Sequence, residues 1–294
     1  MYQQIDSNKR KTVFLMAIFI VFVVFIGWIY GQVTDTGYAG LIGALVISLG
    51  MTAFSYYAGD KVALSTAGAV SITKEENPYV YRLVENLCIT AGLPLPKVYI
   101  IPDPTINAFA TGRDPQHASV AITQGAIDKL ANEELEGVIG HELSHVKNYD
   151  IRLMMIVIVL VGIIALISDW LMRGFLWRKG DNRERGQLGA ILLIVGIVLA
   201  VLSPLIVQLI QLAVSRKREY LADADGSLLT RYPAGLANAL EKIMNEKEPL
   251  RRANNATAHL YIANPFGPTK RFLSNLFSTH PPIEERIAKL RQMA

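Results

Sequence analysis

The chain has 294 residues, of which 51% are hydrophobic and only 18% are charged. A soluble globular protein usually carries about 25% charged residues, so the composition argues against a simple soluble chain. The net charge of +4 is small, and no basic patch is interleaved with aromatic residues, which argues against nucleic acid as a partner. The single cysteine, Cys88, excludes an intramolecular disulfide and a CxxC metal site.

Four apolar runs with almost no charged residues account for this low share of charge. They cover residues 13–30, 36–59, 153–168 and 186–215, and Lys9, Arg10 and Lys11 precede the first of them. About 20 apolar residues in a helix span a bilayer core of about 30 Å. No good cleavage site for a signal peptide follows the first run, so it is expected to stay in the chain as a membrane helix. The sequence therefore predicts four apolar helices and a lipid bilayer as a partner.

The runs divide the chain into alternating membrane and soluble parts. We expect a membrane helix pair at 1–59, a first soluble part at 60–150, a membrane hairpin at 151–215 and a second soluble part at 216–294. The soluble parts together are long enough for one domain with its own core. Strands are expected at 69–73, 97–101 and 118–123, and a helix from Pro78 that ends at Gly92. The predicted fold class is α+β, mainly α, with a small sheet.

Charge predicts the orientation of these parts. The basic residues before the first run place the N-terminus in the cytoplasm, and two crossings return residue 60 to the same side. The short third run and the basic loop at 169–185 argue against a hairpin that crosses. A cytoplasmic hairpin, however, would expose a large apolar surface. We favour the inserted hairpin.

The segment His141-Glu142-Leu143-Ser144-His145 matches H-E-x-x-H. On a helix, which the amphipathic residues before it predict, the two histidines share one face and can reach one zinc ion. Glu142 lies beside the metal, where it can take a proton from water. The alternative is a chance match on a core helix with two buried, hydrogen-bonded histidines.

A catalytic zinc ion needs a third protein ligand. Glu219 and Asp223 lie four residues apart on a helix that follows the last apolar run, so one can bind zinc while the other accepts a hydrogen bond from a ligand histidine. The alternative is a solvated helix surface. Glu241 and Glu246 are weaker rivals among surface-like lysines.

Together with three further segments, these residues resemble a known family. The segments are Asn107–Gly112, Ser215–Asp223 and Ser278–Pro282. With the H-E-x-x-H motif they resemble the HtpX-type membrane zinc metallopeptidases, which are related to the CAAX prenyl proteases. The resemblance implies a multi-pass bacterial inner-membrane protease with its active site in the cytoplasm, which acts in membrane-protein quality control and the stress response on polypeptide substrates.

The resemblance also implies residue roles. One zinc ion per chain would be bound by His141, His145 and Glu219, with Glu142 as the catalytic base and Asp223 as the acid of the family's E-x-x-x-D pattern. His280 is expected to donate a hydrogen bond to the oxyanion, although it could merely precede a helix. Arg286 is expected either to pair with a site carboxylate, near substrate, or to be a solvated helix residue.

Substrate is expected to lie extended against an exposed strand. The candidate edge is His117 to Thr123, where Ala118, Ser119, Val120 and Ala121 would carry the backbone contacts. Asn107, Ala108 and Phe109 are further candidates for substrate contact. The sequence predicts no oligomeric state.

Two other functions stay open. A narrow-specificity CAAX-type processing protease would need a lipid-accommodating chamber, for which four apolar runs are few. A non-catalytic membrane scaffold with a structural zinc would need a fourth protein ligand, which the sequence does not offer near the motif.

Overall fold

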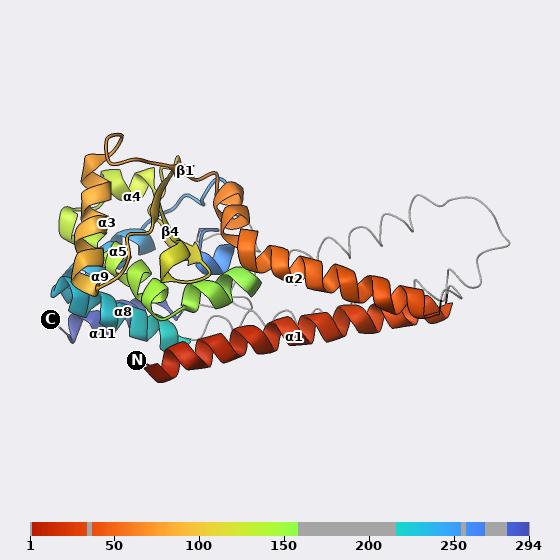
Figure 1. Cartoon of the computed structure of the whole chain (residues 1–294). Helices are drawn as coiled ribbons and strands as arrows, with labels where there is room; N and C mark the ends of the chain where they lie inside the picture. Colours follow the sequence, from red (N-terminus) through yellow and green to blue (C-terminus); the bar gives the residue numbers. More distant parts are fainter. Residues whose placement is uncertain (1, 34–36, 158–215, 254–256, 268–280, 294) are drawn as a thin grey trace.

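The computed structural model describes residues 2–33, 37–157, 216–253, 257–267 and 281–293. A body of helices around a small sheet carries a long hairpin of two helices, whose end of α1 and start of α2 lie far from the body (Figure 1). The predicted run at 186–215 lies outside the described residues, as does the run at 153–168 apart from residues 153–157, which are helical and buried. The predicted hairpin at 151–215 therefore stays a prediction.

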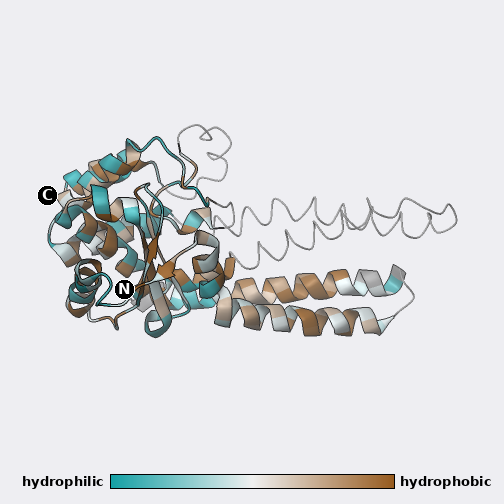
Figure 2. Cartoon of the chain, turned by 90° about the horizontal axis from the view of Figure 1, so that it is seen from above, coloured by the Kyte–Doolittle hydropathy of each residue, from teal (hydrophilic) through white to brown (hydrophobic). Residues whose placement is uncertain are grey.

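The hairpin consists of α1 (Tyr2–Val33) and α2 (Tyr38–Ala67). Two candidate spans of 24 and 30 residues, Ile5–Trp28 and Tyr38–Ala67, are long and apolar enough to cross a membrane. Only 28% and 11% of their most apolar windows are buried, so most of their side chains face outward. Figure 2 shows hydrophobic residues along most of the hairpin, whereas hydrophilic residues gather on the body. The first two predicted apolar helices are thus confirmed as candidate membrane helices.

Small residues let α1 and α2 approach closely. A Cβ atom on Gly40 would lie 2.7 Å from the carbonyl oxygen of Gly27 and 2.9 Å from the Cα of Gly31. A Cβ on Gly27 would lie 2.2 Å from the Cβ of Ala44. Such small residues at helix contacts are typical of helices that pack within a membrane, where dispersion forces rather than the hydrophobic effect hold helices together.

The sheet has four strands in the order β1-β2-β4-β3, with bounds β1 Val70–Ser71, β2 Lys97–Ile101, β3 Ala108–Gly112 and β4 Ala118–Thr123. β4 runs parallel to β2 and antiparallel to β3. The strands expected at 69–73, 97–101 and 118–123 are confirmed. The prediction that His117 to Thr123 forms an exposed edge is wrong, because β4 is paired on both sides. The backbone groups of Ala118, Ser119, Val120 and Ala121 are thus used within the sheet.

The helices of the body pack on both faces of this sheet. Their bounds are α3 Pro78–Ala91, η1 Pro115–His117, α4 Gln124–Lys129, α5 Asn132–Lys147, α8 Arg216–Thr230, α9 Pro233–Met244, η2 Ala258–Leu260 and α11 Ile283–Arg291. As predicted, α3 begins at Pro78 and Gly92, with φ 65°, ends it; the side chain of Asn77 caps its start. The fold is thus mainly helical, with a small mixed sheet.

Neighbouring residues of β3 and β4 belong to two different hydrophobic clusters, one on each face of the sheet. Ala110 and Val120 belong to a large cluster with α3, α5 and α9, whereas Phe109 and Ala121 pack with the end of α2 and with Tyr261. Because neighbouring residues of a strand point to opposite faces, this division follows from strand geometry. The large cluster also contains Leu290 of α11, so segments from both sides of the undescribed residues 158–215 share one core.

Candidate metal centre

Helix α5 carries the H-E-x-x-H segment into the centre of the body. Asn132 is the first residue of α5, and the carboxylate of Glu134 accepts a hydrogen bond from the N–H of Ala131 at 2.7 Å, which satisfies a free donor at the helix start. His141 and His145 are 1% and 4% exposed. They lie on the face of α5 that meets α8.

Helix α8 brings Glu219 to the two histidines because glycines allow close contact. A Cβ on Gly226 would lie 2.8 Å from the backbone nitrogen of His141, and a Cβ on Gly140 would lie 3.2 Å from the carbonyl oxygen of Gly226. Any larger residue at 226 would therefore push α8 away from α5. The predicted proximity of Glu219 to the H-E-x-x-H segment is observed.

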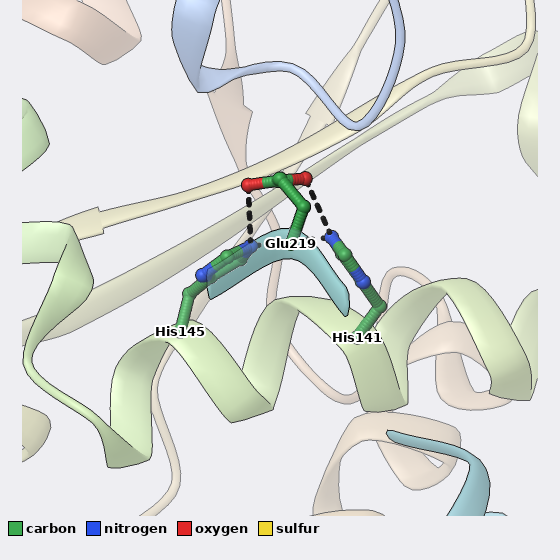
Figure 3. A group of neighbouring side chains, drawn as sticks. All are labelled: His141, His145 and Glu219. Atoms are coloured by element: carbon green, nitrogen blue, oxygen red, sulfur yellow. Dashed lines mark hydrogen bonds and ion pairs between the residues drawn. The ribbon is translucent and has the colours of Figure 1, made fainter. Parts of the chain in front are cut away.

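Three ligand atoms converge in this space, as Figure 3 shows. The Nε2 atom of His141 lies 3.7 Å from Oε2 of Glu219, and the Nε2 atom of His145 lies 3.6 Å from Oε1 of Glu219. All three ligand atoms lie within 4.8 Å of one another. This is the arrangement that a single metal ion needs.

A carboxylate lies behind each imidazole. Asp223 is 2.9 Å from Nδ1 of His141, and Asp150 is 3.0 Å from Nδ1 of His145. A carboxylate at Nδ1 holds the proton there and leaves Nε2 as a lone-pair donor, which is the usual arrangement around ligand histidines. Of the pair Glu219 and Asp223, Glu219 thus faces the space between the histidines, and Asp223 lies behind one of them.

The donor set suits a cation. The two Nε2 atoms lie 3.2 Å apart and both face the Glu219 carboxylate, so three electron-rich groups need a positive charge between them. Burial opposes a charge on His145, but the hydrogen bond to Asp150 and the charge of Glu219 outweigh it and raise the pKa of His145 to about 9. Burial lowers the pKa of His141 to about 4, with Arg286 contributing. The three groups therefore favour positive charge between them, which a bound metal ion would supply.

Arg286 of α11 holds Asp223. Its Nε and Nη2 atoms donate to the two carboxylate oxygens of Asp223 at 2.9 and 2.7 Å, and Nη1 donates to the carbonyl of Ile262 at 2.8 Å. Arg286 is completely buried, so the alternative of a solvated helix residue is wrong. Although burial opposes the charge of Asp223, Arg286 and His141 lower its pKa to about 2. The guanidinium group thus keeps Asp223 ionised behind His141.

Glu142 lies beside the three ligand atoms and is 1% exposed. Its Oε1 atom has no hydrogen-bond partner among the described residues. Burial raises its pKa to about 7, against the opposing charge of His145 and a hydrogen bond from the backbone N–H of Ala110. A carboxyl group with this pKa can both accept and release a proton near neutrality.

Other predicted residues lie elsewhere. The rivals Glu241 and Glu246 form ion pairs with Arg291 at 2.9 Å and with Lys129 at 2.7 Å, away from the histidines. His280 lies outside the described residues, so its oxyanion role stays a prediction.

The segment Asn107 to Phe109 makes contacts inside the fold. Nδ2 of Asn107 donates to the carbonyl of Ala263 at 3.2 Å, and the ring of Phe109 lies edge to face on Tyr261 with centroids 5.2 Å apart. Both side chains are buried. The substrate role of this segment stays a prediction.

The sequence analysis did not identify Asp150 as part of the site. It follows α5 after a sharp turn in which Tyr149 has a φ of 60°, an unusual conformation for a residue other than glycine. This turn directs the carboxylate of Asp150 back to His145. The spacing of five residues from His145 gives no signal of its own, because a continuing helix would carry Asp150 to another face.

Comparisons with known proteins agree with this geometry. Residues 74–294 match the model of Peptidase family M48. The "Protease HtpX homolog" of Dictyoglomus turgidum is 47% identical over 99% of this chain and 94% of its own length. That of Tropheryma whipplei strain Twist is 45% identical over 100% of this chain and 98% of its own. The crystal structure of S. mikatae Ste24p has a similar fold, with a TM-score of 0.53 and 16% identity over 99% of this chain and 67% of that one.

A buried His-His-Glu set beside the Glu142 carboxyl group is typical of the class of metal-dependent hydrolases. The family match over most of the chain then identifies it further: the chain belongs to Peptidase family M48, and it is a metalloprotease related to the HtpX proteases.

Proposed function

We propose that this metalloprotease is a zinc endopeptidase of the bacterial inner membrane that cleaves misfolded or damaged membrane proteins on the cytoplasmic side. The observation that carries the proposal is the convergence of Nε2 of His141, Nε2 of His145 and a carboxylate oxygen of Glu219 within 4.8 Å. Two imidazoles and one carboxylate are a common ligand set of catalytic zinc, which leaves one position open for water.

Each residue around the ligands has a distinct task in this proposal. Bound zinc would supply Lewis-acid chemistry, which makes water acidic and polarises the peptide carbonyl. Glu142 accepts the proton of the attacking water and later delivers it to the nitrogen of the leaving amine. Asp223 and Asp150 keep the Nδ1 protons of the two histidines in place, and Arg286 keeps Asp223 ionised and oriented.

Substrate binding is proposed at β3 rather than at β4. β3 forms one end of the sheet order, and the N–H of Ala110 reaches the Glu142 carboxyl group. The carbonyl of Ala108 already accepts a hydrogen bond from the N–H of Ile262 at 3.0 Å. An extended substrate would therefore pair with the part of β3 that follows Ala108. Backbone pairing with an edge strand suits a protease of broad specificity.

The membrane location rests on the hairpin. The start of α1 and the end of α2 lie at the body (Figure 1): Asn8 of α1 bonds to Asp150, and the end of α2 packs with Phe109. Lys9, Arg10 and Lys11 in α1 favour the cytoplasmic side for this end. A site held there can act on chains that emerge from the bilayer, which supports membrane proteins as substrates.

The test is metal analysis of the purified full-length protein together with digestion of casein. We expect about one zinc ion per chain, loss of digestion after chelation and its return when zinc is added. Digestion that survives complete removal of metal would contradict the proposal.

A further inference from the structure

A polar residue of the first candidate membrane helix reaches the metal centre. Asn8 lies in α1 and is only 3% exposed, although it stands in the polar, basic start of the helix, next to Lys9, Arg10 and Lys11. Its Nδ2 atom donates to the carboxylate of Asp150 at 2.7 Å and to the carbonyl of Asn148 at 2.9 Å. Asp150 in turn holds Nδ1 of His145 at 3.0 Å. One carboxylate therefore joins α1 to a candidate metal ligand.

The hydrogen bonds fix the orientation of the Asn8 amide. Its nitrogen faces two acceptors, whereas its oxygen faces Nη1 of Arg218 at 3.4 Å. The same Nη1 donates to Asp150 at 3.0 Å. A flipped amide would turn its carbonyl toward two other oxygens, which is unfavourable. The contact of Asn8 with Asp150 is therefore specific in direction as well as close.

Asn8 also holds the turn that makes the contact possible. Asn148 ends α5, and Tyr149 adopts the left-handed conformation before Asp150. Such a conformation is costly for a bulky residue and persists only when its surroundings fix it. Asn8 binds on both sides of Tyr149, at the Asn148 carbonyl and at the Asp150 carboxylate, so the position of α1 determines where Asp150 points.

We propose that Asn8 is a positioning residue through which α1 tunes the affinity of the metal centre, an inference that rests on the proposed zinc function. Without the Asn8 amide, Arg218 is the one remaining donor to that oxygen of Asp150 among the described residues, and the buried carboxylate holds His145 less firmly. The segment matched by the family model starts at residue 74, so α1 lies outside it and yet completes the surroundings of a ligand. The metal centre would thus respond to the placement of the membrane helix.

The experiment measures zinc affinity of metal-free full-length protein in detergent by competition with a chromophoric chelator. Asn8→Leu is expected to weaken zinc binding about 10-fold, at the lower end of the range for partners of ligand histidines. The matched control is Thr12→Val. Thr12 is 2% exposed on the same helix, and its hydroxyl donates only to the carbonyl of Asn8 at 2.9 Å among the bonds that the structure describes. This control should bind zinc like the parent.

A double-mutant cycle separates positioning from general destabilisation. Because Asn8 acts through Asp150, Asn8→Leu should cause no further loss in an Asp150→Asn background. Asn8→Ala replaces Asn8→Leu if that variant does not fold, and the same loss is expected because the donor is gone. Equal affinity of the Asn8 variant and the parent, or an equal loss in both backgrounds, would overturn the inference. A parent that binds no zinc would instead contradict the proposed function.

Discussion

The two histidines of the metal centre are held by unlike parts of the chain. On one side, His141 bonds to Asp223, which Arg286 of α11 grips with two hydrogen bonds. On the other side, His145 bonds to Asp150, which receives hydrogen bonds from Arg218 of α8 and from Asn8 of α1. The His141 side is thus internal to the body, whereas the His145 side depends on the helix hairpin. The difference suggests that one ligand is fixed by the fold and the other by its attachment to α1.

The largest loss of metal binding is expected from a change at Glu219, which faces both histidines. Glu219→Gln should weaken metal binding by more than about 100-fold, beyond the loss expected for residues that merely orient ligands, because it removes the negative charge from the His-His-Glu set. Glu241→Gln is the matched control, since Glu241 pairs with Arg291 on the surface. Metal content and casein digestion report the result. Similar behaviour of the two variants would show that Glu219 is not the third ligand.

The next largest loss of metal affinity is expected from the two carboxylates that hold the histidines, so it compares the His141 side with the His145 side directly. Asp223→Asn and Asp150→Asn should each lower metal affinity by about 10–100-fold without preventing folding, because each weakens the hold on one ligand histidine. Zinc titration checks the affinity, and circular dichroism checks the fold. An unchanged affinity for either variant would mean that its side does not orient the ligand.

A smaller effect, on the free energy of unfolding, is expected from a change at Arg286, which donates hydrogen bonds to Asp223. Arg286→Lys keeps the positive charge but loses the paired hydrogen bonds, and we expect it to cost about 1–3 kcal/mol of unfolding free energy. Arg291→Lys on the same helix is the control, because its side chain is 43% exposed and a surface change usually costs less than about 0.5 kcal/mol. Thermal or denaturant unfolding measures both. Equal stability of the two variants would contradict the structural role of Arg286.

The sequence predicted those parts of the site that depend on helical spacing. His141 and His145, and Glu219 and Asp223, each lie four residues apart on one helix, and the structure brings the two pairs together. The candidate membrane helices were also predictable, because a long apolar run carries its own signal.

The remaining features depend on contacts between distant segments. β4 was predicted as a strand but not as an inner one, since its neighbours are chosen by the whole sheet. The burial of Arg286 follows from the packing of α11 against α9 and α8, which its charged sequence does not reveal. Asp150 and Asn8 are 142 positions apart, and their contact needs both the turn at Tyr149 and the docking of α1.

The most direct test of the central claim is Glu142→Gln, measured for zinc content and casein digestion in the same preparation. Glu142 lies beside the ligands without being one of them, so the variant should keep about one zinc ion per chain. Its digestion rate should fall by roughly 10²–10⁴-fold, the contribution typical of a positioned general base. A variant that retains zinc and digests casein as fast as the parent would contradict the role of Glu142 as the base that activates water.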